Sequence, residues 1–271
     1  MAAQKAFILP KDIPLDEYPT PQVFLDEGRR IVEEAQRRGV VMRVMGPLAL
    51  HYHFPDRVEL YASLERLGER YFTDIDFAAY GRGRQQMPDL MKELGYECDL
   101  NTMMTSGKTR HIYYGGAVPM IDVFFDRLEY CHTIEYAGRL ELDPYSVSLT
   151  DILLQKLQIW EINDKDLKDI EFLFVCAPFG EDDDRKVNAE YVARRFADDW
   201  GFWYTATTNL ARVKEHVEGV VALSEAHKAQ VRQVADDLAL RIEAEPKTKG
   251  WAKRAKKGTS KVWFNTGFSD W

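Results

Sequence analysis

The chain has 271 residues, of which 45% are hydrophobic and 30% charged, with a formal net charge of −8. This composition can bury a sizeable core, which excludes intrinsically disordered and collagen-like chains. No apolar stretch approaches the ~20 residues that span a bilayer, so neither a transmembrane helix nor a membrane partner is expected. The negative charge also argues against a protein that coats nucleic acid generally.

The cysteines and the N-terminus indicate a cytoplasmic protein. Cys98, Cys131 and Cys176 are odd in number, widely spaced and without a CxxC pair. Neither a disulfide framework nor a zinc knuckle is therefore expected. The first residues contain one lysine, a very short apolar run and then acidic residues, which is not the pattern of a secretory signal.

Helices and strands are expected to mix in the first half of the chain. Apolar residues recur at helical spacing in some segments and alternate with polar residues in others. In chain order, we expect a helix over residues 20–38, a strand over 41–46, a helix from Pro47, a helix over 57–70, a strand over 71–80, a helix over 87–94, and strands over 110–116 and 119–128. Gly115-Gly116 predicts a hairpin between the last two strands.

The pattern becomes helical after Leu149. We expect helices within residues 149–162, 164–175, 188–200, 210–221 and 224–245. The predicted fold class is α+β, a small mixed β-sheet flanked by helices and followed by a helical domain. The expected domains are an α/β core with an N-terminal helix (1–148), a helical domain (149–245) and a basic, aromatic C-terminal tail (246–271).

Three aspartates on expected strands are the main candidates for chemistry. Asp74 and Asp76 stand at positions i and i+2, so both project from one face of a strand, ~7 Å apart at their Cα atoms. Asp122 lies within an apolar strand, where an unpaired carboxylate is costly to bury. A solvated strand face would explain the first pair alone, but three converging carboxylates favour one or two Mg²⁺ ions.

A glycine turn offers a second candidate feature. The strand over 41–46 runs into Gly46-Pro47 and then into a helix, whose first amides and positive dipole end suit a phosphate. An ordinary strand–helix turn is the alternative. Arg43, Lys108 and Arg110 are basic residues on or near the expected strands, and the pattern singles out none of them for phosphate. His132, after the Asp122 strand, is a further pocket candidate.

This order of motifs resembles the nucleotidyltransferase superfamily with the DNA polymerase β-like fold, and most closely its AbiEii/MenT-like branch. The resemblance covers about residues 38–175. It comprises the glycine turn, the TDIDF and IDVFF segments, and a helix carrying Lys156 followed by Lys165-Asp166-Leu167-Lys168-Asp169.

The resemblance implies a role for each motif residue. Asp74 and Asp76 would bind the metal ions that carry the triphosphate of an NTP, and Asp122 would bind the catalytic metal. Gly46 and the amides after it would hold the phosphates. Lys156 would neutralise triphosphate charge, and Asp166 or Asp169 would orient the lysine or the acceptor.

Two departures from the family pattern stand beside these roles. Pro47 and Leu48 replace the usual Ser or Thr after the glycine, and Pro47 removes a backbone donor. The 27 residues between Gly46 and Asp74 exceed the usual gap. Two structural alternatives to these roles also stay open. Lys156 can be a surface residue whose aliphatic stem covers apolar neighbours, and residues 165–169 can be a solvent-exposed run of charges.

The tail combines positive charge with aromatic rings. From Pro246 to Val262 there are seven basic residues and no acidic one, with Trp251 in between and Trp263 and Phe264 just beyond. Cations with stacking rings are typical of RNA contact, whereas a solvated terminus is the alternative. The aromatic groups VWF and FSDW favour a partly ordered tail.

The predicted function is an enzyme, a Mg²⁺-dependent nucleotidyltransferase that moves an NMP from an NTP, such as ATP, to an acceptor hydroxyl and releases pyrophosphate. The acceptor is a small molecule, a protein or an RNA. The alternatives are a non-catalytic nucleotide- or partner-binding module on the same fold, and the toxin component of a toxin–antitoxin pair.

Overall fold

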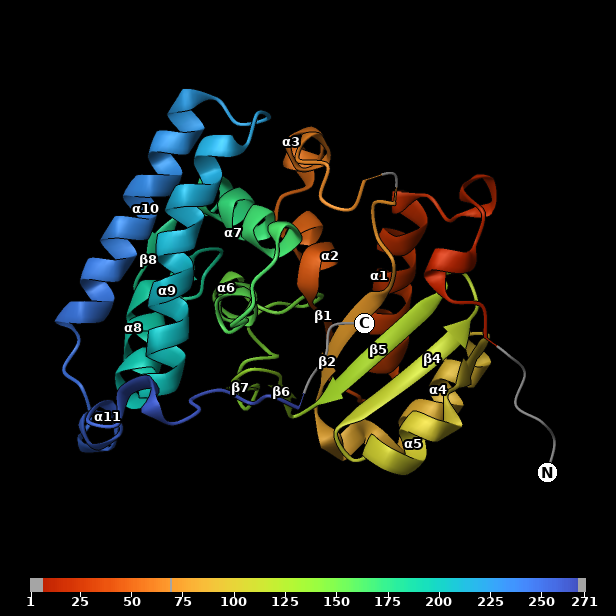
Figure 1. Ribbon diagram of the computed structural model, residues 1–271. Coiled ribbons are helices and arrows are strands. Elements are labelled where there is room, and N and C mark those ends of the chain that lie inside the picture. Colours follow the sequence, from red (N-terminus) through yellow and green to blue (C-terminus); the bar gives the residue numbers. More distant parts are fainter. Residues whose placement is uncertain (1–6, 69, 268–271) are drawn as a thin grey trace. The chain divides into compact units, whose positions relative to one another are not determined.

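The computed structural model describes residues 7–68 and 70–267 and shows an α+β protein (Figure 1). The expected α+β fold class is confirmed, with a mixed β-sheet, flanking helices and a helical second half. The chain divides into two compact units. The sheet unit comprises Met1–Tyr52, Leu67–Leu128 and Glu135–Val147, and the helical unit comprises His53–Arg66, Glu129–Ile134 and Ser148–Trp271.

The sheet unit is built on a five-stranded sheet in the order β1-β2-β5-β4-β3. Its strands are β1 (Met42–Val44), β2 (Ile75–Ala79), β3 (Tyr96–Cys98), β4 (Arg110–Gly115) and β5 (Met120–Phe125). Strands β2 and β5 are parallel, whereas the other neighbouring pairs are antiparallel. The expected hairpin joins β4 to β5, and Gly115 and Gly116 both take the positive φ angles (87° and 70°) that its turn requires.

Helices pack around this sheet. The sheet unit contains α1 (Pro21–Arg37), α2 (Gly46–His53), α4 (Met87–Glu93) and α5 (Leu100–Ser106), with short 3₁₀ turns at Pro10–Asp12, Leu15–Glu17 and Gly81–Gln86. Helix α1 buries Phe24, Ile31 and Val32 and contacts β1. It ends before Gly39, whose φ of +72° is the left-handed conformation that stops helices.

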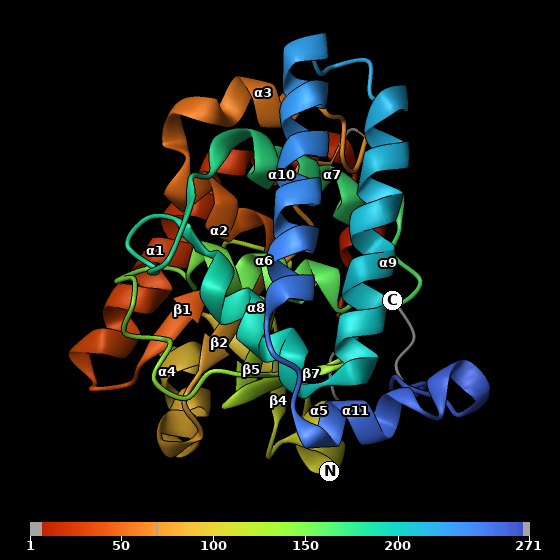
Figure 2. The ribbon, with the colours of Figure 1, turned by 90° about the vertical axis from the view of Figure 1, so that its left-hand side faces the viewer.

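The helical unit contains seven α-helices among its described residues. They are α3 (Val58–Ser63), α6 (Leu149–Leu157), α7 (Asp164–Cys176), α8 (Ala189–Asp198), α9 (Trp200–His216), α10 (Glu225–Ala244) and α11 (Lys249–Ala255), with 3₁₀ turns at Pro55–Arg57, Val217–Gly219 and Gly258–Ser260. Helices α8, α9 and α10 lie side by side (Figure 2). Phe196, Phe202 and Ile242 are buried in the core of this unit.

Two expected helices differ from the structure. The segment 57–70 forms only the six-residue helix α3, because Glu65 and Gly68 take positive φ angles that end a helix. Helix α9 begins at Trp200, ten residues before the expected start at Leu210. The Asp199 side chain accepts a hydrogen bond from the Phe202 N–H and thereby caps α9 at its true beginning.

Two small sheets and the tail complete the described chain. β6 (Arg127–Glu129) pairs with β7 (Thr133–Glu135), and β8 (Phe179–Gly180) pairs with β9 (Val187–Asn188). In the tail, Trp263 packs edge-on against Trp160 with ring centroids 4.7 Å apart, so this part is ordered. The FSDW residues, 268–271, lie outside the described residues. None of the described helices is both long and apolar enough to cross a bilayer.

Candidate active site

Two of the three candidate aspartates are direct neighbours in the sheet. Asp76 on β2 and Asp122 on β5 are register partners of the parallel pair. Such partners lie ~4.8 Å apart and project their side chains to the same face of a sheet. Asp76 is half-buried, whereas Asp122 is 3% exposed. The sheet thus places these two carboxyl groups side by side.

Asp74 and Gly46 lie next to this pair. Asp74 directly precedes β2 and accepts a hydrogen bond of 2.9 Å from the hydroxyl of Thr73. Gly46 begins α2 with a φ of +67°, and a Cβ atom here would lie 3.2 Å from a carboxylate oxygen of Asp76. The Met45 N–H donates to the Asp76 carbonyl at 2.8 Å. The start of α2 is therefore fixed against the strand, and Gly46 leaves room for the carboxylate.

Arg110 on β4 binds the carboxylate of Asp122. Its Nε lies 2.9 Å from both carboxylate oxygens, and its Nη2 donates to Oδ2. Because β4 pairs Ile112 with Asp122, Arg110 stands diagonally opposite the aspartate on the same face. Burial raises the pKa of Asp122 to about 6, against the opposing effect of Arg110, and the charge of Asp74 adds to this rise.

The three aspartates provide the type of ligand atom that magnesium binds. Carboxylate oxygens are the ligands that this ion prefers, and Asp74, Asp76 and Asp122 supply three carboxylates. With Arg110 their formal charge is −2 when all are ionised, three negative charges against one positive, which favours a cation. Among residues 7–68 and 70–267, however, no three carboxylate, imidazole or thiol groups are arranged to hold one ion. The third carboxylate of this donor set, Asp122, is engaged by Arg110 instead.

The other candidate residues form a buried ionic cluster in the helical unit. Lys156 on α6 donates to Asp166 on α7 and lies beside Asp169, each at 2.7 Å. Arg66, after α3, lies 2.8 Å from Asp169, and Tyr61 donates to the same carboxylate at 2.7 Å. Lys156 is 8% exposed, Asp166 5% and Asp169 1%. Lys156 is therefore not a surface lysine, and Asp166 and Asp169 do not belong to a solvent-exposed run of charges.

Mutual attraction keeps this cluster charged. Burial alone would lower the pKa of Lys156, but the carboxylates of Asp166 and Asp169 raise it above its ordinary value. Burial likewise opposes ionisation of Asp169, but Arg66 and Lys156 lower its pKa. Two cations balance two anions, so no charge is left uncompensated at this depth. The cluster links α6, α7 and the segment after α3.

The basic residues that the sequence left open are now distinguished. Arg43 donates to the backbone carbonyls of Met42 and Asp143, and Lys108 is exposed. Of the three, Arg110 contacts a candidate aspartate. His132 is buried in the helical unit, where its Nε2 lies 2.8 Å from the Thr205 hydroxyl, so it has the character of a core histidine.

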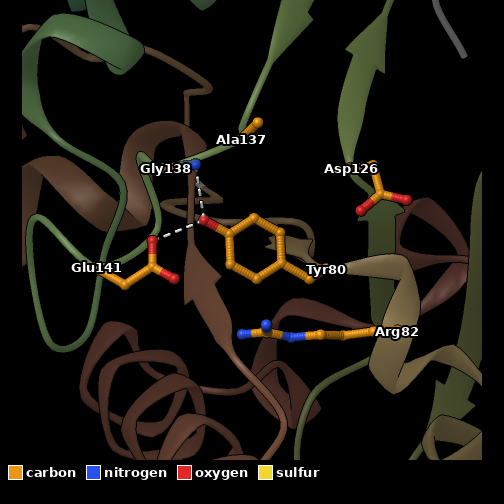
Figure 3. Close-up of a pocket in the computed structure, with 6 residues that line it drawn as sticks. All are labelled: Tyr80, Arg82, Asp126, Ala137, Gly138 and Glu141. Atoms are coloured by element: carbon orange, nitrogen blue, oxygen red, sulfur yellow. Dashed lines mark hydrogen bonds between the residues drawn. The ribbon is translucent and has the colours of Figure 1, made fainter.

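A cavity of about 350 Å³ lies at the other end of the same strands (Figure 3). It is lined by Tyr80, Arg82, Asp126, Ala137, Gly138 and Glu141. Tyr80 and Asp126 directly follow β2 and β5, whereas Asp76 and Asp122 lie near the beginnings of these strands. The Tyr80 hydroxyl donates to Glu141 at 2.6 Å and accepts from the Gly138 N–H at 3.1 Å. Because these polar groups already satisfy one another, the cavity has no evident part in the aspartate chemistry.

Sequence reasoning missed the partners Arg110 and Arg66. A signal for Arg110 existed in the hairpin, since pairing Tyr114 with Met120 around the Gly115-Gly116 turn brings Arg110 diagonal to Asp122. Arg66 carried no such signal, because it stands in an irregular turn and meets Asp169 only through tertiary packing.

No protein-family model and no curated protein matches the chain. Among solved structures, that of the antibiotic-resistance factor ANT(2'')-Ia, an aminoglycoside nucleotidyltransferase, aligns with 88% of this chain and 94% of its own. The two share 14% sequence identity, and the TM-score is 0.32. A likeness at that score supports no inference about this chain, whose function has to be judged from its own residues.

Proposed function

We propose that the chain is a Mg²⁺-dependent nucleotidyltransferase, which moves a nucleoside monophosphate from an NTP to an acceptor hydroxyl and releases pyrophosphate. The observation that carries the proposal is the registered pair of Asp76 and Asp122, with Asp74 two residues before Asp76. Carboxylates held this close repel each other, and Arg110 compensates only one of the three negative charges, so a divalent ion with a bound triphosphate would supply the rest. The motif resemblance selects the same three aspartates.

Each residue of the sheet unit has a role in this proposal. Asp74 and Asp76 would hold Mg²⁺ together with the triphosphate, and Asp122 would complete the ligand set. The bound ion would supply a Lewis acid that stabilises charge on the reacting phosphate. The acceptor oxygen bonds to the α-phosphorus while the bond from that phosphorus to pyrophosphate breaks, and a carboxylate oxygen of Asp122 takes the hydroxyl proton. Amides at the start of α2, after Gly46, bind phosphate oxygens.

For the helical unit by itself, we propose that Lys156 binds phosphate charge, with Asp166 and Asp169 orienting its ammonium group. In support, the contacts of 2.7 Å to both aspartates fix the ammonium group in one place. A lysine that is charged and rigid before substrate arrives needs little reorganisation to stabilise phosphate charge.

Labelling tests the proposal. The protein is incubated with each of the four α-³²P-labelled NTPs, Mg²⁺ and a cell extract, and the products are separated into small molecules, protein and RNA. We expect one NTP to transfer label in the presence of Mg²⁺ and no transfer with EDTA, and the labelled fraction identifies the acceptor class. Absence of transfer from all four NTPs, with an extract that supports a known nucleotidyltransferase, would contradict the proposal.

Two observations favour a second candidate, a non-catalytic nucleotide-binding module. Pro47 removes a donor from the start of α2, and Arg110 already engages Asp122. Thermal unfolding separates the candidates. An enzyme is stabilised by NTP plus Mg²⁺ more than by NTP with EDTA, whereas a module that uses only amides and basic side chains responds equally to both.

We also propose that the C-terminal tail contacts RNA. Five of its lysines are exposed, and none pairs with a described carboxylate: Lys249, Lys253, Lys256, Lys257 and Lys261. Meanwhile Arg254 stacks on Trp200 and Trp251 packs edge-on against Trp203, with distances of 4.6 Å and 5.1 Å to ring centroids. The aromatic side of α11 is thus used within the helical unit, which disfavours insertion into a membrane and leaves the lysines for a polyanion.

Fluorescence anisotropy with a labelled RNA strand tests this contact. We expect K253Q/K257Q to weaken binding and to reduce the slope of affinity against salt by about two, one for each lost phosphate contact. K92Q/K108Q, at two exposed lysines of the sheet unit, is the matched control. Equal weakening by both pairs would mean that net charge matters and the tail does not.

A further inference from the structure

Arg110 contacts both carboxylate oxygens of the candidate metal ligand Asp122. Its Nε is within 2.9 Å of both carboxylate oxygens, and its Nη2 is bonded to one of them. A guanidinium bound in this two-point way is among the strongest partners that a carboxylate finds in proteins. A metal ion needs the same oxygen lone pairs, so both cations cannot hold this carboxylate fully at once.

The surroundings of Arg110 allow its guanidinium group to move away from the Asp122 carboxylate. The Asp122 side chain is 4% exposed, but that of Arg110 is 28% exposed, so the guanidinium reaches the carboxylate from the solvent side. Its Cζ also lies 5.2 Å from the centre of the Phe124 ring, its register partner on β5. The guanidinium itself therefore lies over an aromatic ring, where it can remain while its N–H groups change partner.

A triphosphate would supply that new partner. Guanidinium groups bind phosphate oxygens with the same two-point geometry as carboxylates, whereas Asp122 and Asp76 offer only negative charge to an incoming nucleotide. When a metal–nucleotide complex arrives, Arg110 can exchange the Asp122 carboxylate for phosphate as Asp122 turns to the ion. The positive charge beside Asp76 and Asp122 is then kept throughout the exchange.

We propose that Arg110 is an internal competitor of the divalent cation at Asp122 and couples metal binding to nucleotide binding. The inference deepens the nucleotidyltransferase proposal and rests on it for the identity of the nucleotide. Arg110 then controls when Asp122 is open to the ion and, once released, contacts the triphosphate itself. Metal alone should bind weakly to the wild-type protein, and metal with nucleotide should bind strongly.

Binding of Mn²⁺ alone, followed by electron paramagnetic resonance, tests the competition directly. R110Q removes the competing charge, so we expect it to bind Mn²⁺ about tenfold more tightly than the wild type, at about pH 9 where protons compete little for carboxylates. R38Q is the matched control, since Arg38 is an ion-paired arginine of the same unit, bound to Glu34 and Glu93. Its Mn²⁺ affinity should equal that of the wild type.

A second variant covers the case in which R110Q does not fold. R110K keeps the charge but cannot make the two-point contact, so its Mn²⁺ affinity should fall between those of the wild type and R110Q. A non-hydrolysable NTP analogue should tighten Mn²⁺ binding strongly in the wild type and only slightly in R110Q. Mn²⁺ affinity that is unchanged or weaker in both folded variants would overturn the inference.

The results also separate this inference from the proposed function. Tighter Mn²⁺ binding by R110Q, in a protein that transfers no nucleotide, would support the competition and contradict the transferase. Nucleotide transfer by the wild type, with equal Mn²⁺ affinity in R110Q, would support the transferase and contradict the competition.

Discussion

Asp76 and Asp122 are register partners across the parallel strands β2 and β5, although they are far apart in sequence. Parallel strands cannot be joined by a hairpin, so a longer connection must bring the second strand back. Here that connection holds α4, β3, α5 and β4. The same connection delivers Arg110 to the edge of β5, so one topological feature assembles both carboxylates and their arginine.

Asp76→Asn should abolish nucleotide transfer without unfolding the protein. Asparagine keeps the shape and one acceptor oxygen but removes the charge that Mg²⁺ requires. The metal-free melting temperature should hold or rise, because one of two adjacent carboxylates has been neutralised. Asp89→Asn, at an exposed position in the first turn of α4, serves as the control. Unchanged labelling, or a marked fall in the metal-free melting temperature, would show that Asp76 is not a metal ligand.

Gly46→Ala should stop transfer at a modest cost in stability. Alanine at a φ of +67° costs ~1 kcal/mol, and its Cβ would lie 3.2 Å from the Asp76 carboxylate. Gly39→Ala is the matched control, because Gly39 has a φ of +72° and open space around the added Cβ. Urea unfolding should show similar losses for the two variants, while only Gly46→Ala loses activity. Full transfer activity in Gly46→Ala would show that Gly46 has no role in nucleotide binding.

Sequence periodicity predicted the elements whose signals are local. Helix α1 and the β4–β5 hairpin lie within a few residues of their expected ranges, because an apolar stripe and a glycine turn each act over short distances. The first half of α9 was missed. Its buried face after Trp200 recurs at helical spacing but includes the polar residues Thr205 and Asn209, so the apolar signal in the sequence is weak. The position of the start depends on the Asp199 cap.

In the candidate site, too, features set by local sequence were predictable and features set by tertiary contacts were not. Alternation along residues 73–77 and the apolar run around Asp122 identify the strands that carry Asp76 and Asp122, but β2 begins only at Ile75, so Asp74 lies just before it. That all three aspartates bind metal stays a prediction. The ion pairs that surround the site residues could not be predicted from pattern. Arg110 meets Asp122 through strand register, and Arg66 meets Asp169 through packing of segments distant in sequence.

Lys156→Met should destabilise the protein by ~4 kcal/mol, since it leaves the buried carboxylates of Asp166 and Asp169 with less compensating charge. Lys214→Met removes an exposed ion pair with Asp236 and should cost no more than ~1 kcal/mol. Urea unfolding measures both. K156M/D166N should regain part of the loss because it also removes one of the uncompensated charges. Equal effects of the two single variants would mean that the buried cluster contributes little to stability.

His132 should make stability depend on pH in the weakly acidic range. The imidazole stacks on Phe202 with ring centroids 4.9 Å apart, and its Nε2 meets the Thr205 hydroxyl at 2.8 Å. Burial lowers the pKa of His132 to about 4 from 6.5, although Asp199 opposes this effect and Arg195 adds to it. The folded protein thus excludes a proton that the unfolded chain binds.

The sign of the effect follows from proton counts. Between about pH 6.5 and pH 4 the unfolded chain binds more protons at His132 than the folded protein, so stability falls as pH falls. The shift corresponds to a loss of ~3 kcal/mol, complete once the pH is below both values. His132→Gln has no proton to bind and can keep a hydrogen bond to Thr205. Subtracting its urea-unfolding free energies from those of the wild type across this range isolates the histidine. A difference that stays constant with pH would show that His132 takes up its proton equally readily in the folded and unfolded states, so that burial does not shift its pKa.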